Sequence, residues 1–316
     1  MLLSRHEIAD NVWNDFVTTS PQGCIYHFTW YLDVICPDWS AIVVGNAEHW
    51  NAIMPLPMSQ KVGIHYALQA PFAQYSGVLF RPQIGKQLTQ WSNKKRWCEA
   101  IVQDIPTSIK LFKFNFAPQF DYPLPFHWKG YQLEAKYTYW LSLEPTAKEI
   151  EQGFAKSVRQ AIRKSKQEGL VLVEAENIDD LLRFSLEQKK FLPDSQYQKM
   201  PELWRVLKEK DKGMVLEIRD KEGRLQTGGL FLKDAERWIT IFGSNSNPEN
   251  KETGAVAYML SEVIQMAKRE GVDYFDFEGS MMEGVERFFR SFGGSPIPYL
   301  LISKNTLPKA LKWLKK

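Results

Sequence analysis

Few cysteines occur in this chain of 316 residues, and the three present, Cys24, Cys36 and Cys98, form no CxxC pair. An odd number without metal-ligand spacing indicates free thiols in a reducing compartment. No apolar run approaches the roughly 20 residues that span a bilayer, and Met1–Glu7 turns polar too soon for a secretory signal. We therefore expect a cytoplasmic protein, and the five histidines, which lack ligand spacing, predict no metal site.

A strong charge excess is also lacking, because 40 Lys and Arg against 37 Asp and Glu leave a net charge of +3. Such a balance excludes a dedicated non-specific nucleic-acid binder, although a local basic site stays open. The apolar fraction of 44% is enough for a sizeable core. The length suggests two domains or one large one.

Aromatic residues are abundant at 13% and are concentrated in the first half of the chain. There the sequence indicates short strands, such as Leu111–Phe116, in which apolar and polar residues alternate. The pattern changes near residue 145, where Thr146 and Glu149 form a helix-capping box. Helices and strands then interleave. We therefore predict one domain over residues 1–145 and a second over residues 146–316.

A strand, a polar loop and a helix follow one another in the second half, and they could hold an anionic group. Ile239–Gly243 indicates the strand, and a helix begins near Gly254. The start of a helix offers unpaired N–H groups and the positive end of its dipole, which suit a phosphate. The alternative is an ordinary capped helix. The candidate phosphate-binding residues are Lys251, Thr253, Gly254 and Ala255.

Three stretches carry a family resemblance. Lys251-x-x-Gly254-x-Val256 resembles a relaxed form of the Gln/Arg-x-x-Gly-x-Gly/Ala pyrophosphate loop of GNAT acetyltransferases. Residues 154–165 resemble the Arg-x-x-Ile-Arg-Lys-Ala helix of FemABX-like transferases. Residues 275–280 and 287–294 resemble the Asp-Phe-x-Gly-Ser … Phe-Lys-x-x-Phe-Gly ending of that family. The three patterns occur in one order and cover about residues 140–300.

This resemblance implies an α/β (α+β) fold of two tandem GNAT-like domains, each a mixed, mostly antiparallel sheet flanked by helices. It also implies an N-acyltransferase that moves an acyl or aminoacyl group from a CoA- or tRNA-linked donor to an amine, with a cell-envelope precursor as one acceptor. No permanently bound cofactor is implied, since acyl-CoA or aminoacyl-tRNA acts as co-substrate. The alternatives are an aminoacyl-tRNA-dependent peptidoglycan peptide ligase and a non-catalytic GNAT-fold binding protein.

Two carboxylates near a strand end are the candidate general bases. Asp276 and Glu278 alternate along the predicted strand, so both are expected to point the same way. Their proximity would raise one pKa, which suits deprotonation of an attacking amine. Glu278 is the preferred base, because this chain has a carboxylate at a position where the family often has Gly. For Asp276 a structural role, accepting backbone hydrogen bonds, is the favoured alternative. Tyr258 is a candidate general acid, with core packing as the alternative.

Cations could hold the substrates. Lys156, Arg159 and Arg163 share one helix face and suit the phosphates of a nucleotide-linked substrate or of a tRNA acceptor end, or they form a solvated face. Aminoacyl-tRNA-using family members usually have Lys where this chain has Phe289, and Arg290 is the nearest cation. That difference puts the peptidoglycan reaction in doubt.

Two further segments are candidate contacts. Tyr75 could line a substrate cleft, although an aromatic core position is the alternative. The tail Leu307–Lys316 has apolar residues on one helical face and lysines mostly elsewhere. This pattern is typical of an interfacial helix near anionic lipid and equally of a terminal helix packed on its own domain.

Overall fold

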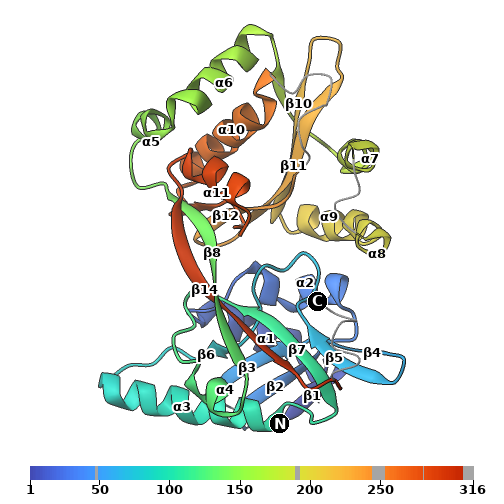
Figure 1. Ribbon diagram of the computed structural model, residues 1–316, viewed down its shortest axis with the longest axis vertical. Helices are drawn as coiled ribbons and strands as arrows, with labels where there is room; N and C mark the ends of the chain where they lie inside the picture. Colours follow the sequence, from blue (N-terminus) through green and yellow to red (C-terminus); the bar gives the residue numbers. More distant parts are fainter. Residues whose placement is uncertain (47–48, 189–192, 244–252, 280, 309–316) are drawn as a thin grey trace. The chain divides into compact units, whose positions relative to one another are not determined.

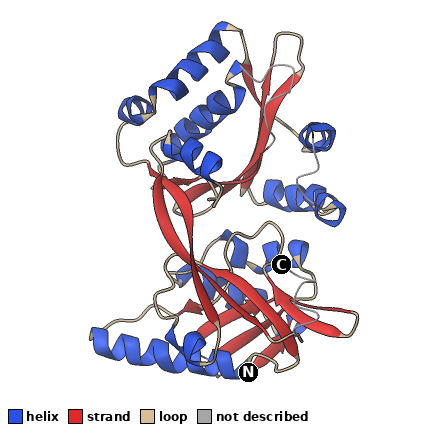
Figure 2. Cartoon of the chain, in the orientation of Figure 1, coloured by secondary structure: helices blue, strands red, loops and turns tan. Residues whose placement is uncertain are grey.

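A computed structural model describes residues 1–46, 49–188, 193–243, 253–279 and 281–308. Contacts between Cα atoms divide the chain into two compact units. Unit 1 comprises Met1–Lys136 and Pro298–Lys316, and unit 2 comprises Tyr137–Ile297. Figures 1 and 2 show strands and helices in both units, with α5, α6, α10 and α11 in unit 2 and α1 to α4 in unit 1.

Unit 1 is built on short strands and four α-helices among its described residues. The helices are α1 (Asp10–Thr19), α2 (Thr29–Ile35), α3 (Gln87–Asp104) and α4 (Leu124–Trp128), with 3-10 turns at Arg5–Glu7 and Ile25–His27. The strands are β1 (Leu2–Ser4), β2 (Ser40–Gly45), β3 (Trp50–Leu56), β4 (Met58–Lys61), β5 (Ile64–Leu68), β6 (Leu79–Phe80) and β7 (Ile109–Phe116). The strand orders are β1-β2-β3-β6 and β4-β5-β7, the latter continued by β14 (Ser295–Asn305).

The core of unit 1 is largely aromatic. Phe112, Phe114 and Phe116 are buried along β7, while Lys113 between them is exposed, so the predicted alternation is confirmed. β7 pairs with β5 in parallel and with residues 300–305 of β14 in antiparallel orientation. The last strand therefore lies beside a strand that ends at residue 116.

Unit 2 holds one sheet with helices on both faces. Its helices are α5 (Ala147–Gly153), α6 (Lys156–Gln167), α7 (Asp179–Gln188), α8 (Asp194–Tyr197), α9 (Met200–Glu209), α10 (Ala255–Glu270) and α11 (Glu283–Arg290). Its strands are β9 (Val171–Glu174), β10 (Gly213–Arg219), β11 (Leu225–Lys233), β12 (Arg237–Gly243) and β13 (Tyr274–Asp276), with the end of β8 (Gln132–Ser142). The strand order is β8-β13-β12-β11-β10-β9.

The sheet of unit 2 is antiparallel except where β12 lies parallel to β13. Figure 1 shows α5, α6, α10 and α11 on one face, and α7, α8 and α9 on the other. Buried residues of α6 and α10, among them Ile162 and Val263, pack with strand residues such as Phe275 in one hydrophobic core. A parallel pair joined by α10 forms a βαβ unit, and this unit carries the candidate site.

The structure differs from the predicted division of the chain at both ends of unit 2. The chain enters unit 2 within β8, at Tyr137, rather than after residue 145. It leaves unit 2 within β14, because residues 300–305 pair with β7. Local composition could not reveal this pairing, since the partner strand lies about 190 positions earlier. No helix in the described ranges is long and apolar enough to cross a membrane.

Candidate active site

The parallel strands β12 and β13 part at one edge of the unit 2 sheet. Their pairing runs from Arg237 opposite Tyr274 to Ile239 opposite Asp276 and ends there. On its other side β12 has a register shift, because Phe231 faces Thr240 and Leu230 faces Phe242. A β-bulge of this kind bends a strand and increases its twist. The two strands therefore part after Ile239 and Asp276, while β12 continues to Gly243 beside β11.

A tight turn follows β13 at the point where the two strands part. The carboxylate of Asp276 accepts hydrogen bonds at Oδ1 from Thr138 Oγ1 (2.7 Å) and from the backbone N–H of Glu278 (2.9 Å). Thr138 Oγ1 in turn accepts the N–H of Gly279 at 3.0 Å. Glu278 has φ of 55°, a left-handed conformation that favours glycine. The strand alternation expected for the two carboxylates therefore ends at Asp276.

The two carboxylates of this turn, Asp276 and Glu278, lie in different electrostatic environments and therefore suit different roles. Asp276 is completely buried, and its Oδ2 lies 3.6 Å from Nε of Arg237. Burial raises the pKa of Asp276, and the Arg237 guanidinium opposes that rise. Burial raises the pKa of half-buried Glu278 well above its ordinary value, and the charge of Asp276 adds to the rise. A carboxylate with a raised pKa is a better proton acceptor, so Glu278 suits a general base.

The start of α10 is held against α6. Gly254 has φ of 75°, and a Cβ added there would lie 2.6 Å from the carbonyl oxygen of Ala161. Ser165 Oγ on α6 donates to the carbonyl oxygen of Thr253 at 2.5 Å. No side chain of the described residues caps the helix, whose first residue is Ala255. Its first N–H groups therefore remain available to an anion.

The structure brings together three of the four residues predicted to bind phosphate. Thr253, Gly254 and Ala255 form the start of α10, whereas Lys251 lies outside the described residues. The start of α10 and the Asp276–Glu278 turn stand on the same βαβ unit, since the helix connects β12 to β13. The candidate phosphate site and the candidate base therefore each follow the carboxyl end of one of the two parallel strands.

The basic face of α6 divides into a structural and an open part. The guanidinium of Arg159 donates to the carbonyl oxygens of Gln152 (2.8 Å) and Phe154, so it caps the end of α5. Lys156 and Arg163 are exposed and form no ion pair with any described residue. They remain available to an anionic ligand.

Tyr258 and Arg290 share no hydrogen bond or ion pair with Glu278 among the described residues. Tyr258 lies on the first turn of α10, with the Lys166 ammonium 5.2 Å from its ring centre. Burial raises the pKa of Tyr258, and the charge of Glu262 adds to the rise. Arg290 is paired with Glu286 at 2.8 Å on exposed α11.

Tyr75 lies in unit 1, where it is completely buried. Its ring meets those of Tyr26 and Tyr299 edge to face, with centroids 6.3 and 5.2 Å away. The structure therefore places Tyr75 in an aromatic cluster of unit 1, which was the alternative interpretation of this residue.

Sequence reasoning missed Thr138, Arg237 and Thr240. Thr138 lies on β8, about 140 positions from the carboxylate that it contacts, so no local pattern could indicate its role. Arg237 is buried beside Asp276. Thr240 follows the last residue of β12 that pairs with β13, and its buried Oγ1 has no hydrogen-bond partner among the described residues. The only available signal was an arginine and a threonine within an otherwise apolar strand.

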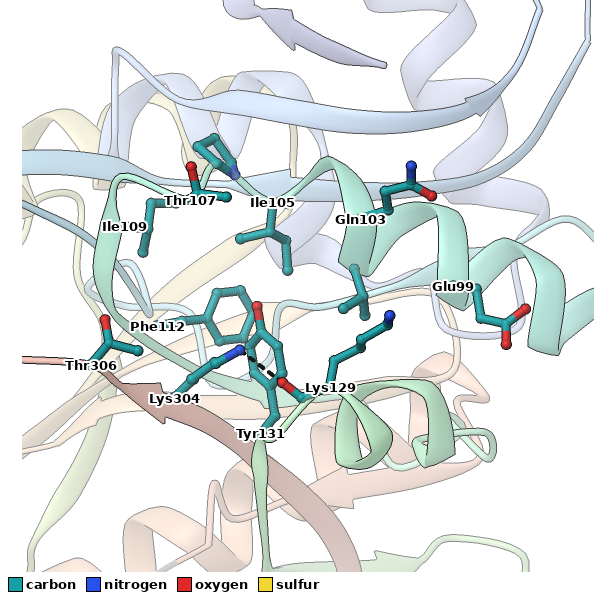
Figure 3. A pocket seen from close by; sticks show the side chains of 12 residues that line it. Glu99, Gln103, Ile105, Thr107, Ile109, Phe112, Lys129, Tyr131, Lys304 and Thr306 are labelled. Atoms are coloured by element: carbon teal, nitrogen blue, oxygen red, sulfur yellow. Dashed lines mark hydrogen bonds between the residues drawn. The ribbon is translucent and has the colours of Figure 1, made fainter.

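A separate pocket of about 600 Å³ lies in unit 1 and contains none of the predicted site residues. Figure 3 shows Tyr131 and Lys304 beneath the end of α3. The Lys304 ammonium donates to the carbonyl oxygen of Lys129 at 2.8 Å and lies 4.8 Å from the Tyr131 ring centre. Burial raises the pKa of Tyr131 to about 12, so its phenol stays protonated. No His, Cys, Asp and Glu cluster of three or more in the described residues could hold a metal ion.

Comparisons with known proteins agree with this geometry. Residues 152–290 match the model of the family described as acetyltransferase (GNAT) domain. The matched range lies within unit 2 and includes β12, α10 and Glu278. No curated protein matches the sequence.

Solved structures match nearly the whole chain. FemX is similar with a TM-score of 0.68 at 12% identity, covering 97% of this chain and 98% of its own. L-PGS from Bacillus licheniformis has a TM-score of 0.58 at 12% identity, with 97% and 95% covered. A tandem GNAT protein from the clavulanic acid biosynthesis pathway has a TM-score of 0.55 at 10% identity, with 98% and 99% covered. The predicted fold of two tandem GNAT-like units is thereby confirmed, and residues 152–290 of unit 2 match the GNAT acetyltransferase domain.

Proposed function

We propose that the chain transfers an acyl group from a CoA-linked donor to an amine at the point where β12 and β13 part. The observation that carries this proposal is the turn after β13. It places a half-buried carboxyl of raised pKa, Glu278, beside the point where the strands part. A GNAT domain is an acyl-CoA-using fold, and the uncapped start of α10 provides N–H groups for the donor phosphates.

The donor would extend from the start of α10 along β12. Its phosphates would meet Thr253, Gly254 and Ala255, with Lys251 and exposed Lys156 and Arg163 as further cations. Beyond Ile239 the edge of β12 that faced β13 has no strand partner in the part of the chain that the structure describes. Its backbone N–H groups could accept the donor in the manner of an added strand and stabilise the oxyanion.

The reaction is a nucleophilic acyl substitution. The amine nitrogen attacks the thioester carbonyl carbon, a C–N bond forms, and the C–S bond breaks. Glu278 takes the proton that the amine loses, and Tyr258, whose pKa is raised, remains protonated and is the proposed proton donor to the leaving thiolate. Asp276 holds the turn through Thr138 and the N–H of Glu278 rather than touching substrate.

An aminoacyl-tRNA donor is the second candidate, supported by the fold shared with FemX. One observation favours CoA over it. Where tRNA-using members of the resembled family usually carry Lys, Phe289 stacks on Phe277 with ring centroids 5.1 Å apart. This position contributes packing rather than an ammonium group, and the nearest cation, Arg290, is already paired with Glu286.

The proposed acceptor is an amine of a cell-envelope precursor, and the proposed location is the cytoplasm. The solved structure of a C-terminal domain from Agrobacterium fabrum, named as that of a putative lysylphosphatidylglycerol synthetase, is similar with a TM-score of 0.50 at 11% identity, and its name supports a cell-envelope acceptor. The basic tail is a candidate for membrane contact or for packing on its own domain, and its residues 309–316 lie outside the described residues.

A thiol-release assay with acetyl-CoA and a panel of primary amines tests the proposal. We expect Glu278→Gln to lower kcat/KM by about 10²- to 10⁴-fold, the usual contribution of a general base. Glu278→Gly, which relieves the left-handed backbone, should lose activity equally and remain folded. Exposed Glu283→Gln is the matched control.

Two outcomes would contradict parts of this proposal. Unchanged turnover of Glu278→Gln would remove the base assignment. Calorimetry that detects neither CoA nor aminoacyl-tRNA binding would favour the non-catalytic alternative, whereas binding of alanyl-tRNA alone, with transfer to a peptidoglycan precursor, would establish the second candidate.

A further inference from the structure

The first half of α3 makes little use of the unit 1 core. Among its residues only Trp97, Cys98, Ile101 and Val102 are buried, all in the second half of the helix. Figure 1 shows the first half of α3 reaching past the strands of unit 1. In proteins most helical stability comes from packing of an apolar face. Packing against the core therefore does not explain why the helix extends to these solvent-facing residues.

Large apolar side chains are exposed on and beside this half-helix. Leu88 and Trp91, one turn apart, are 74% and 47% exposed, and Trp128 on α4 is 54% exposed. The ammonium of Lys95 lies 5.7 Å from the Trp128 ring centre and connects the two helices. We call this region the α3–α4 surface. It comprises Ile84, Lys86, Leu88, Trp91, Lys95, Arg96, Leu124, Trp128 and Lys129.

Cations outnumber acids around these apolar residues. Residues 81–97 include the cations Arg81, Lys86, Lys94, Lys95 and Arg96 and no Asp or Glu. The dipole of a helix favours acidic residues in its first turn, yet α3 has none there. The nearest acids, Glu99 and Asp121, are paired with Lys95 and Lys94. This distribution of charge does not stabilise the helix dipole, and it is complementary to an anionic partner.

We propose that the α3–α4 surface docks on a membrane containing anionic phospholipid. Exposed Trp and Leu side chains would enter the headgroup region, where indole rings are favoured, and the surrounding cations would face lipid phosphates. The proposal does not depend on the acyl donor or on the catalytic role of Glu278. It gives a protein without a membrane-spanning helix in its described residues a way to reach a lipid-linked acceptor.

Vesicle co-sedimentation tests this docking with the full chain. We expect binding to phosphatidylglycerol-containing vesicles and weak binding to pure phosphatidylcholine vesicles. Because each cation near such a surface contributes about fivefold in affinity, Lys86→Gln with Arg96→Gln should weaken binding about 25-fold. Trp91→Ala with Trp128→Ala should weaken it at least about tenfold, since both indoles leave the interface. Both pairs of changes are at exposed positions and should leave the fold intact.

Val62→Ser provides the matched control, because Val62 is 92% exposed in unit 1 outside the α3–α4 surface. This control should bind vesicles as the unchanged chain does. The proposal is overturned if the unchanged chain does not bind, if both paired variants bind normally, or if only replacement of the lysines in residues 309–316 abolishes binding. Light scattering that shows a dimer dependent on Trp91 and Trp128, with vesicle binding unaltered, would instead assign this surface to a second copy of the chain.

Discussion

Both units contain a strand, a long helix and a second strand, but they employ the helix differently. In unit 2, α10 joins β12 to β13 and buries residues from Ala255 to Ala267, along nearly its whole length. In unit 1, α3 joins β6 to β7 and buries residues only between Trp97 and Val102. The same local arrangement therefore produces one helix whose start is fixed in the core and one whose start projects into solvent (Figure 1).

This difference shows how a repeated fold can divide two tasks. A fixed helix start with uncapped N–H groups would provide a precise anion site, because its position is set by close packing on α6. A projecting helix start cannot position a reacting group, but it can present a wide contact surface. Variants at matching places in the two helices test this division.

The largest expected difference concerns one leucine in each helix. Leu260 of α10 is 4% exposed, and Leu260→Ala should lower the free energy of unfolding by about 2 to 5 kcal/mol through lost burial and a cavity. Leu88→Ala on α3 should change it by less than about 0.5 kcal/mol. Urea denaturation of both variants measures the difference. Similar losses would mean that the first half of α3 is packed in solution.

The glycines before the two helices give the next test. Gly254→Ala should cost about 2 to 3 kcal/mol and weaken CoA binding, because the new Cβ would meet Ala161 in a left-handed backbone. Gly85→Ala, at φ of 115° with no atom within 4 Å, should cost only about 1 kcal/mol. Equal costs in thermal or urea unfolding would show that close packing does not set the start of α10.

A pH series separates the charge of the unit 2 site from its packing. The folded-state pKa of Glu278 is raised above the ordinary value of 4.5, so the native state holds its proton more tightly than the unfolded chain. The stability of the unchanged protein should therefore fall as pH rises from about 4.5 through the raised pKa. Glu278→Gln should be the more stable at pH 7, and the gap should narrow toward pH 4.5. A gap that widens on acidification would contradict this sign.

The smallest expected effect distinguishes two arginines of α6. Arg159→Ala should cost about 0.5 to 1.5 kcal/mol, because two carbonyl oxygens at the end of α5 lose their donor. Arg163→Ala should leave urea stability unchanged while weakening CoA or tRNA binding in calorimetry. The reverse pattern would exchange the structural and ligand-binding roles assigned to them.

Local signals predicted the elements of the fold well. The capping box at Thr146 and Glu149 forms as expected, with both reciprocal hydrogen bonds. The expected helix from Gly254 to Glu270 is α10, between left-handed glycines at 254 and 271. Caps and periodicity are properties of neighbouring residues, so a sequence displays them directly. The return of β14 to β7 is a long-range pairing, which no neighbouring residue indicates.

The candidate site was predictable in residue type more than in geometry. The acidic pair and the small residues of the α10 start were identified, because both accompany a strand end or a helix start. The left-handed conformation of Glu278 could not be predicted, since it depends on hydrogen bonds of this turn that involve Thr138 on β8. The structural role of Arg159 likewise depends on where α5 ends.

The return of the last strand also affects the order in which the protein can form on the ribosome. β7 is synthesised early, but residues 300–305, which cover one of its edges, emerge only after the whole of unit 2. During that interval β7 presents an unpaired edge carrying Phe112, Phe114 and Phe116, an arrangement that invites pairing with other chains. Unit 2 can close its own core first, whereas this edge of β7 can be covered only when translation reaches the end of β14.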